Sequence, residues 1–150
     1  MASIRHFGLV VKDMDNALRF YRDILGLHKK HSATEYGDFI DNALGQENVE
    51  VETLKMCDDN DGVLIELLKF NNPTTISRDE STTVTIGASH IAFTVDSIET
   101  IFQKLIANNV RVFGEPKESP DGKVMMTYCR DFEGNLIELV QPIENQRNAQ

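Results

Sequence analysis

The chain is short of positive charge and of long apolar runs. Of its 150 residues, 15 are Lys or Arg and 24 are Asp or Glu, so the formal net charge is −9. Nucleic acids and anionic membrane surfaces need a basic face, so this balance argues against both as partners. No apolar run approaches the length needed to cross a bilayer, and the N-terminus has no apolar signal core. We therefore expect a cytoplasmic protein that acts on a small molecule.

Cysteine is also scarce. Cys57 and Cys129 are the two present, and neither belongs to a CxxC pair. We interpret them as reduced thiols in strand-like segments, because neither a disulfide framework nor a zinc knuckle can be built from them.

One short apolar stretch occurs twice, and each copy carries a glutamate at the same place. The copies are GVLIELL from Gly62, with Glu66 inside it, and GNLIELV from Gly134, with Glu138 inside it. A lone carboxylate in an apolar strand is costly to bury. Two glutamates in matching surroundings therefore need a shared explanation.

A histidine is repeated upstream in the same way. His6 and His90 each open a strand-like segment that passes through an aspartate into a helical pattern. The order His, helix, Glu thus occurs twice, which indicates duplication of one supersecondary unit. The first copy has more residues between its His and its Glu, and we expect the excess in an internal loop.

Hydrophobic periodicity predicts the order β-α-β-β-β in each copy. In the first copy we expect strands over 4–12, 27–32, 48–57 and 63–70, a helix over 14–25 between Asp13 and Gly26, a turn at 33–37, a strand or helical turn at 39–44, and a hairpin turn at 61–62. In the second we expect strands over 89–95, 110–113, 123–130 and 135–140, and a helix that begins with an Asp96–Glu99 capping box and ends near Asn108.

The fold class is therefore α+β. We expect a single domain over 1–150, made of two tandem βαβββ modules, 1–70 and 88–142, joined by a linker at 71–87 that begins Asn-Asn-Pro-Thr-Thr and continues in a stretch rich in Ser, Thr, Asp and Glu.

The alternation of side chains along each strand predicts where the repeated His and Glu residues point. Glu66 faces away from Ile65 and Leu67, because side chains alternate along a strand. The helix of each module must cover one face, which leaves the Glu-bearing face as the inside of a half-open barrel. Two such halves would place His6, Glu66, His90 and Glu138 around one cavity. This mixed set of nitrogen and oxygen ligands suits a divalent ion such as Ni, Zn, Co, Mn or Fe. His28 and His31 are an alternative source of ligands.

The chain resembles the vicinal oxygen chelate superfamily, the glyoxalase and bleomycin-resistance group. The matching stretches are HFGLVVKDMD from His6, ALRFYRDILGL from Ala17, LIEL from Leu64, HIAFTV from His90 and RDFEGNLIEL from Arg130. The resemblance implies paired βαβββ modules, usually assembled as a homodimer, and a metal held by one residue from each of four strands.

Carried over position by position, the four candidate ligands match the His-Glu-His-Glu set of bacterial-type glyoxalase I. The resemblance therefore implies a metal-dependent lyase or isomerase that acts on a small α-oxygenated carbonyl compound, for example a hemithioacetal, through an enediolate. Glu138 would be the base, and Glu66 a ligand or a second base. The alternatives are a methylmalonyl-CoA epimerase-like enzyme, an extradiol dioxygenase, in which Glu66 would be surplus, and a non-catalytic binding protein of the bleomycin-resistance type.

Seven further side chains are candidates for contacting the substrate. The candidates for lining the cavity are Phe39, Met125, Met126, Tyr128 and Arg130, and the candidates for binding an anionic group are Lys123 and Arg5.

Overall fold

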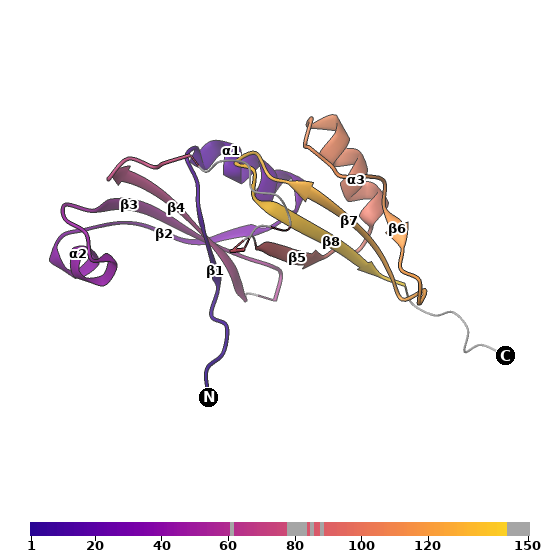
Figure 1. Cartoon of the computed structure of the whole chain (residues 1–150), viewed down its shortest axis with the longest axis horizontal. Helices are drawn as coiled ribbons and strands as arrows, with labels where there is room; N and C mark the ends of the chain where they lie inside the picture. The colour runs from indigo at the N-terminus through magenta and orange to yellow at the C-terminus, as the bar shows by residue number, and fades with distance from the viewer. Residues whose placement is uncertain (61, 78–83, 85, 88, 144–150) are drawn as a thin grey trace. The chain divides into compact units, whose positions relative to one another are not determined.

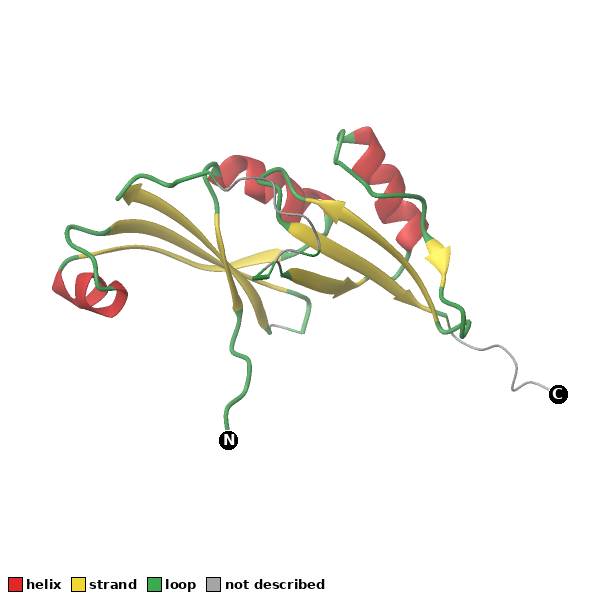
Figure 2. Cartoon of the chain, in the orientation of Figure 1, coloured by secondary structure: helices red, strands yellow, loops and turns green. Residues whose placement is uncertain are grey.

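The computed structural model describes residues 1–60, 62–77, 84, 86–87 and 89–143 (Figures 1 and 2). The chain divides into two compact units, Met1–Asp79 and Glu80–Gln150. Each unit contains one open four-stranded sheet, with strand order β1-β4-β3-β2 in the first and β5-β8-β7-β6 in the second. The predicted fold class, α+β with two tandem modules, is confirmed. The predicted linker, 71–87, begins inside β4 and contains residues 78–83 and 85, which lie outside the described residues, so the linker stays a prediction.

The first unit follows the predicted order with one added helix. Its elements are β1 (Phe7–Val10), α1 (Met14–Leu18), the π-helical turn η1 (Arg19–Ile24), β2 (His28–Tyr36), α2 (Asp38–Leu44), β3 (Glu50–Cys57) and β4 (Val63–Asn72). Asp13 caps α1 as predicted, since its carboxylate accepts from the backbone N–H groups of Asp15 and Asn16. The helical turns end before Gly26, whose φ of 83° suits a residue without a side chain. Of the two alternatives for 39–44, the structure has the helical one. The turn predicted at 61–62 includes Asp61, which lies outside the described residues.

The turn predicted at 33–37 is wrong. Residues Ala33 to Tyr36 continue β2 and pair with β3, up to Tyr36 opposite Glu50. The whole of β2 is exposed or half-buried, because it forms the outer edge of the sheet. Such a strand has no buried face and so no apolar alternation, which is the pattern that the prediction needed.

The second unit repeats the order with a shorter edge strand. Its elements are β5 (His90–Thr94), α3 (Ile98–Ala107), β6 (Lys117–Glu118), β7 (Val124–Arg130) and β8 (Leu136–Pro142). The strand predicted near 110–113 is reduced to a single bridge between Val112 and Cys129. The chain then leaves the sheet through Gly114 and Pro116, and proline has no N–H to give to a ladder. It returns to pair with β7 only at β6.

The predicted Asp96 cap is also wrong, because α3 begins one residue later. Ser97 is the cap, and its Oγ accepts a hydrogen bond from the Thr100 N–H. The side chain of Glu99 does not reach back to the cap; its Oε1 accepts from Gln103 Nε2 at 2.8 Å. The Ile98 N–H is satisfied from β8, where Gln141 Oε1 accepts it at 2.8 Å.

Ser97→Ala is expected to lower the free energy of unfolding by about 1 kcal/mol, since it leaves an N–H in the first turn of α3 without its acceptor. The matched control is Asp96→Ala, which we expect to change stability by less than about 0.5 kcal/mol. Urea unfolding followed by circular dichroism measures both. A larger loss in the Asp96 variant would contradict this cap assignment.

On β4 and β8, the buried residues lie on the face opposite Glu66 and Glu138. In the first unit Ile65 and Leu67 of β4 are fully buried, together with Phe20 and Tyr21 of η1, and α1 contacts β4. In the second, Ile137 and Leu139 of β8 and Leu105 of α3 are fully buried, and α3 contacts β8. The predicted parity therefore holds on both strands: the glutamate lies between two buried neighbours and points the other way.

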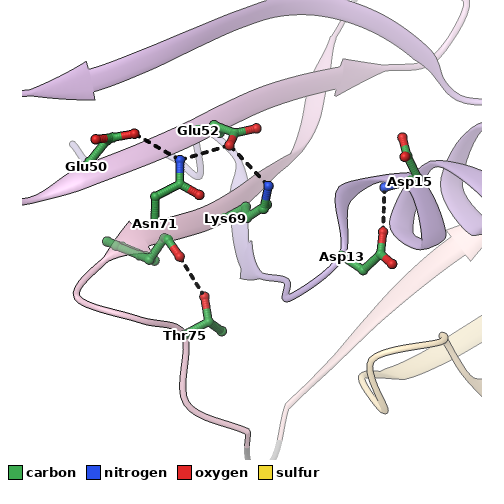
Figure 3. Close-up of polar contacts among 8 residues, drawn as sticks. Asp13, Asp15, Glu50, Glu52, Lys69, Asn71 and Thr75 are labelled. Carbon is green, nitrogen blue, oxygen red and sulfur yellow. Dashed lines mark hydrogen bonds and ion pairs between the residues drawn. The ribbon is translucent and has the colours of Figure 1, made fainter.

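A polar network links β3 and β4 (Figure 3). Asn71 Nδ2 donates to Glu50 Oε1 at 3.1 Å and to Glu52 Oε1 at 2.9 Å, and Lys69 Nζ lies 3.2 Å from the same Glu52 oxygen. The hydrogen bonds from Asn71 and then Lys69 lower the pKa of Glu52. In the same register Glu52 lies opposite Lys69, and Lys55 lies opposite Glu66 further along the two strands.

Candidate metal centre

In the first unit the strand register brings His6 and Glu66 together. β1 and β4 run parallel with Gly8 beside Glu66, so His6, two residues earlier, is on the same face. His6 Nε2 lies 3.0 Å from Glu66 Oε2, with the two side chains 26% and 13% exposed.

The second unit repeats this arrangement. β5 and β8 run parallel with Ala92 beside Glu138, and His90 is again two residues earlier. His90 Nε2 lies 3.0 Å from Glu138 Oε2, with side chains 46% and 16% exposed. Both half-sites therefore present one imidazole nitrogen and one carboxylate oxygen, at the same separation and on the sheet face opposite the core.

The separation of these donors suits a metal ion. Nitrogen and oxygen ligands about 2.1 Å from an ion and at a right angle to each other are about 3 Å apart, which is also a hydrogen-bond distance. Each unit by itself joins one histidine to one glutamate. No group of three or more His, Cys, Asp or Glu side chains that could hold a metal occurs among the described residues.

A third side chain adjoins each glutamate, and it differs between the units. On β3, Lys55 lies opposite Glu66, and its Nζ is 3.5 Å from Glu66 Oε1. On β7, Tyr128 lies opposite Glu138. Burial raises the pKa of Tyr128, and the charge of Glu138 and a hydrogen bond to it add to this effect. The Tyr128 ring also meets the His90 ring edge to face, with centroids 5.7 Å apart. Lys55 was not among the candidates predicted from the sequence, although lysine is depleted in strands and its presence there can indicate a functional position.

The alternative histidines are placed differently. His28 Nε2 lies 2.6 Å from Asp59 Oδ1, and both side chains are largely exposed. His31 is exposed on β2. This pair also joins one imidazole to one carboxylate, but Asp59 is exposed, whereas Glu66 and Glu138 are mostly buried.

The remaining candidates are distributed over the surface and β7. Phe39 on α2 is 83% exposed, and Met125 and Met126 on β7 are half-buried. Arg5 is exposed ahead of β1, and Lys123 Nζ lies 3.4 Å from Asp121 Oδ2. Arg130 Nη1 donates a hydrogen bond to the carbonyl oxygen of Gly134. Among the predicted cavity-lining residues, Tyr128 lies beside a predicted ligand, since it is opposite Glu138 on the neighbouring strand.

Both cysteines are buried free thiols, as the sequence predicted. Burial raises the pKa of Cys129 to about 12, so it stays protonated and unreactive. In the described part of the chain, no helix combines the length and apolar character that a bilayer span requires.

Comparison with known proteins identifies the family. Residues 3–139 match the family model described as the Glyoxalase/Bleomycin resistance protein/Dioxygenase superfamily. The chain is also similar to the crystal structure of a glyoxalase family protein from Bacillus cereus, with 26% identity, a TM-score of 0.86 and coverage of 95% of each chain.

Two more distant structures share the fold alone. The trypanothione-dependent glyoxalase I of Leishmania major is 20% identical, with a TM-score of 0.62 and coverage of 94% of this chain and 87% of that one. The fosfomycin resistance protein FosX of Listeria monocytogenes, solved with Mn(II) and sulfate, is 20% identical, with a TM-score of 0.60 and coverage of 98% of each chain. The family match over most of the chain agrees with the resemblance seen in the sequence, and the chain belongs to the Glyoxalase/Bleomycin resistance protein/Dioxygenase superfamily.

Proposed function

We propose that this protein is a metal-dependent enzyme of the glyoxalase I type, a lyase or isomerase that acts on a small α-oxygenated carbonyl compound such as a hemithioacetal. The observation that carries the proposal is the matched pair of half-sites, each with a His Nε2 and a Glu Oε2 separated by 3.0 Å. Two relatives of similar fold support it: one is a glyoxalase I and the other was solved with a divalent ion. The protein would work in the cytoplasm as a homodimer.

In this proposal His6, Glu66, His90 and Glu138 hold one divalent ion, Ni, Zn, Co, Mn or Fe, whether the two half-sites come from one chain or from two copies. The bound ion supplies Lewis-acid stabilisation of the negative charge that develops on the substrate oxygens. Both glutamates are mostly buried, and coordination compensates the desolvation of their charges.

Glu138 is the proposed general base. It removes the proton next to the carbonyl and gives the enediolate, and return of the proton to the neighbouring carbon completes an isomerisation. Tyr128 forms a hydrogen bond with Glu138 and orients the carboxylate of this glutamate. Glu66 is the proposed ligand, and its neighbour on the next strand is the ammonium of Lys55 where that of Glu138 is a phenol.

Titration of metal-free protein with Ni²⁺ or Zn²⁺ in a calorimeter tests the ligand set. We expect one ion per chain, and a loss of affinity on the order of 100-fold or more in His6→Ala and in His90→Ala, since even residues behind the ligands contribute 10- to 100-fold. The matched control is His28→Ala, which should bind as the wild type does. Two ions per chain, or an intact affinity in both ligand variants, would overturn the four-ligand site.

Activity is tested with metal-loaded protein, methylglyoxal and a panel of thiols, by following formation of the 2-hydroxyacyl thioester. Turnover that disappears with a chelator and returns with the ion supports the enzyme. A protein that binds the ion yet converts none of these hemithioacetals would exclude the glyoxalase I reaction.

A further inference from the structure

Lys55 has a position that the proposed metal site does not account for. It lies on β3, an interior strand with β4 on one side and β2 on the other. Lysine is depleted in interior strands, where it serves neither packing nor protection of an edge. Its side chain is 32% exposed, and it shares the sheet face of Glu66 and not that of the core.

The ammonium group of Lys55 has hydrogen-bonding capacity left. It reaches Glu66 Oε1 at 3.5 Å, a long ion pair, and Glu66 is its one ionic partner among the described residues. An ammonium has three donors, so two are left for another acceptor. The other oxygen of Glu66 adjoins His6, so the imidazole and the ammonium lie at separate oxygens of the same carboxylate.

The second unit shows that this cation is not a general requirement of the half-site. Tyr128 occupies the same register position opposite Glu138, and it is uncharged. The two half-sites are thus alike in their ligands and differ at the position opposite the glutamate, where one has an ammonium and the other a phenol. In the proposed function the ligands are supplied by His and Glu, so Lys55 adds a positive charge beside the ion that no ligand role requires.

We propose that Lys55 binds an anionic group of the substrate, so that the protein prefers α-oxygenated carbonyl compounds that carry a carboxylate or another single negative charge. This inference rests on the proposed function and specifies its substrate class. In a chain with a net charge of −9, a local cation beside the reacting centre also overcomes the general repulsion of anions.

A pair of matched probes tests the proposal. Hydroxyacetone and hydroxypyruvate both present a hydroxyl next to a carbonyl, and they differ in that a carboxylate replaces a methyl group. We expect metal-loaded wild-type protein to bind hydroxypyruvate about tenfold more tightly than hydroxyacetone in calorimetry, and this preference to weaken as salt is raised.

Lys55→Met should remove most of this preference with little change in affinity for hydroxyacetone, and Lys55→Arg should retain it. The matched control is Lys69→Met, which removes a lysine with a comparable ion pair, to Glu52 at 3.2 Å, from the same pair of strands. Full preference in Lys55→Met, or an equal loss in Lys69→Met, would overturn the role of Lys55.

Metal titration of the same samples distinguishes failure of the proposed anion contact from failure of the proposed metal site. One ion per chain in Lys55→Met together with a lost preference supports both the site and the anion contact. One ion per chain with the preference intact overturns the anion contact and leaves the metal site standing. No bound ion in the wild type overturns the proposed function, and the inference with it.

Discussion

Glu138→Gln is expected to slow proton abstraction from the substrate by about 10²- to 10⁴-fold, the range that a positioned general base contributes. The amide keeps the shape of the side chain but cannot accept the proton. The measurement is incorporation of deuterium from D₂O into recovered substrate and product by mass spectrometry, with the ion at saturation. This experiment follows the proton itself, and it applies to isomerisation and epimerisation alike because both pass through the same enediolate.

The matched control is Glu66→Gln. We expect it to weaken metal binding, yet at saturating metal to keep deuterium exchange within about tenfold of the wild type. The reason is structural: the two oxygens of Glu66 adjoin His6 and Lys55, whereas the neighbour of Glu138 on the next strand is a neutral phenol. Exchange that survives in Glu138→Gln would remove Glu138 from the role, and loss of exchange in Glu66→Gln alone would assign the base to Glu66.

Local sequence was enough for the features that depend on periodicity. The stretches around Glu66 and Glu138 are apolar on both sides of the glutamate, and side chains alternate along a strand, so the two faces could be assigned by parity before any pairing was known. The Asp13 cap and the Gly26 stop were equally local. The repeat singled out the four candidate ligands, and the structure pairs them within each unit, His6 with Glu66 and His90 with Glu138. Their meeting around one ion stays a prediction.

The features that were missed depend on pairing between distant segments. Lys55 lies opposite Glu66 because β3 and β4 form an antiparallel pair, with a shift of register between Met56 and Cys57. Nothing in the sequence fixes that shift, and a different one would place another residue beside the glutamate. The length of β2 was missed for a similar reason, since its hydrogen bonds to β3 and not its own side chains keep it extended.

The start of α3 shows the same limit at shorter range. Asp96 and Glu99 have the spacing of a capping box, but Gln141 of β8 accepts the hydrogen bond from Ile98 N, and the helix begins at Ser97. A tertiary contact from forty-three residues away therefore decides between two good local caps.

Ile137→Ala is expected to lower the free energy of unfolding by about 2–5 kcal/mol, the range for truncating a fully buried aliphatic side chain. Ile137 is 0% exposed and lies next to Glu138 on β8, on the opposite face. Urea unfolding followed by circular dichroism measures the change.

The matched control is Val140→Ala, on the same strand but on the face of Glu138, where the valine is half-buried. We expect it to cost about 1 kcal/mol or less, since fewer contacts are lost. Neither variant alters a ligand, so both should still bind the ion. A strand that slipped by one residue would exchange its two faces, and Val140 would then be the costly position while Glu138 turned into the core. The ranking of these two variants therefore tests the parity that points Glu138 away from the core and toward His90.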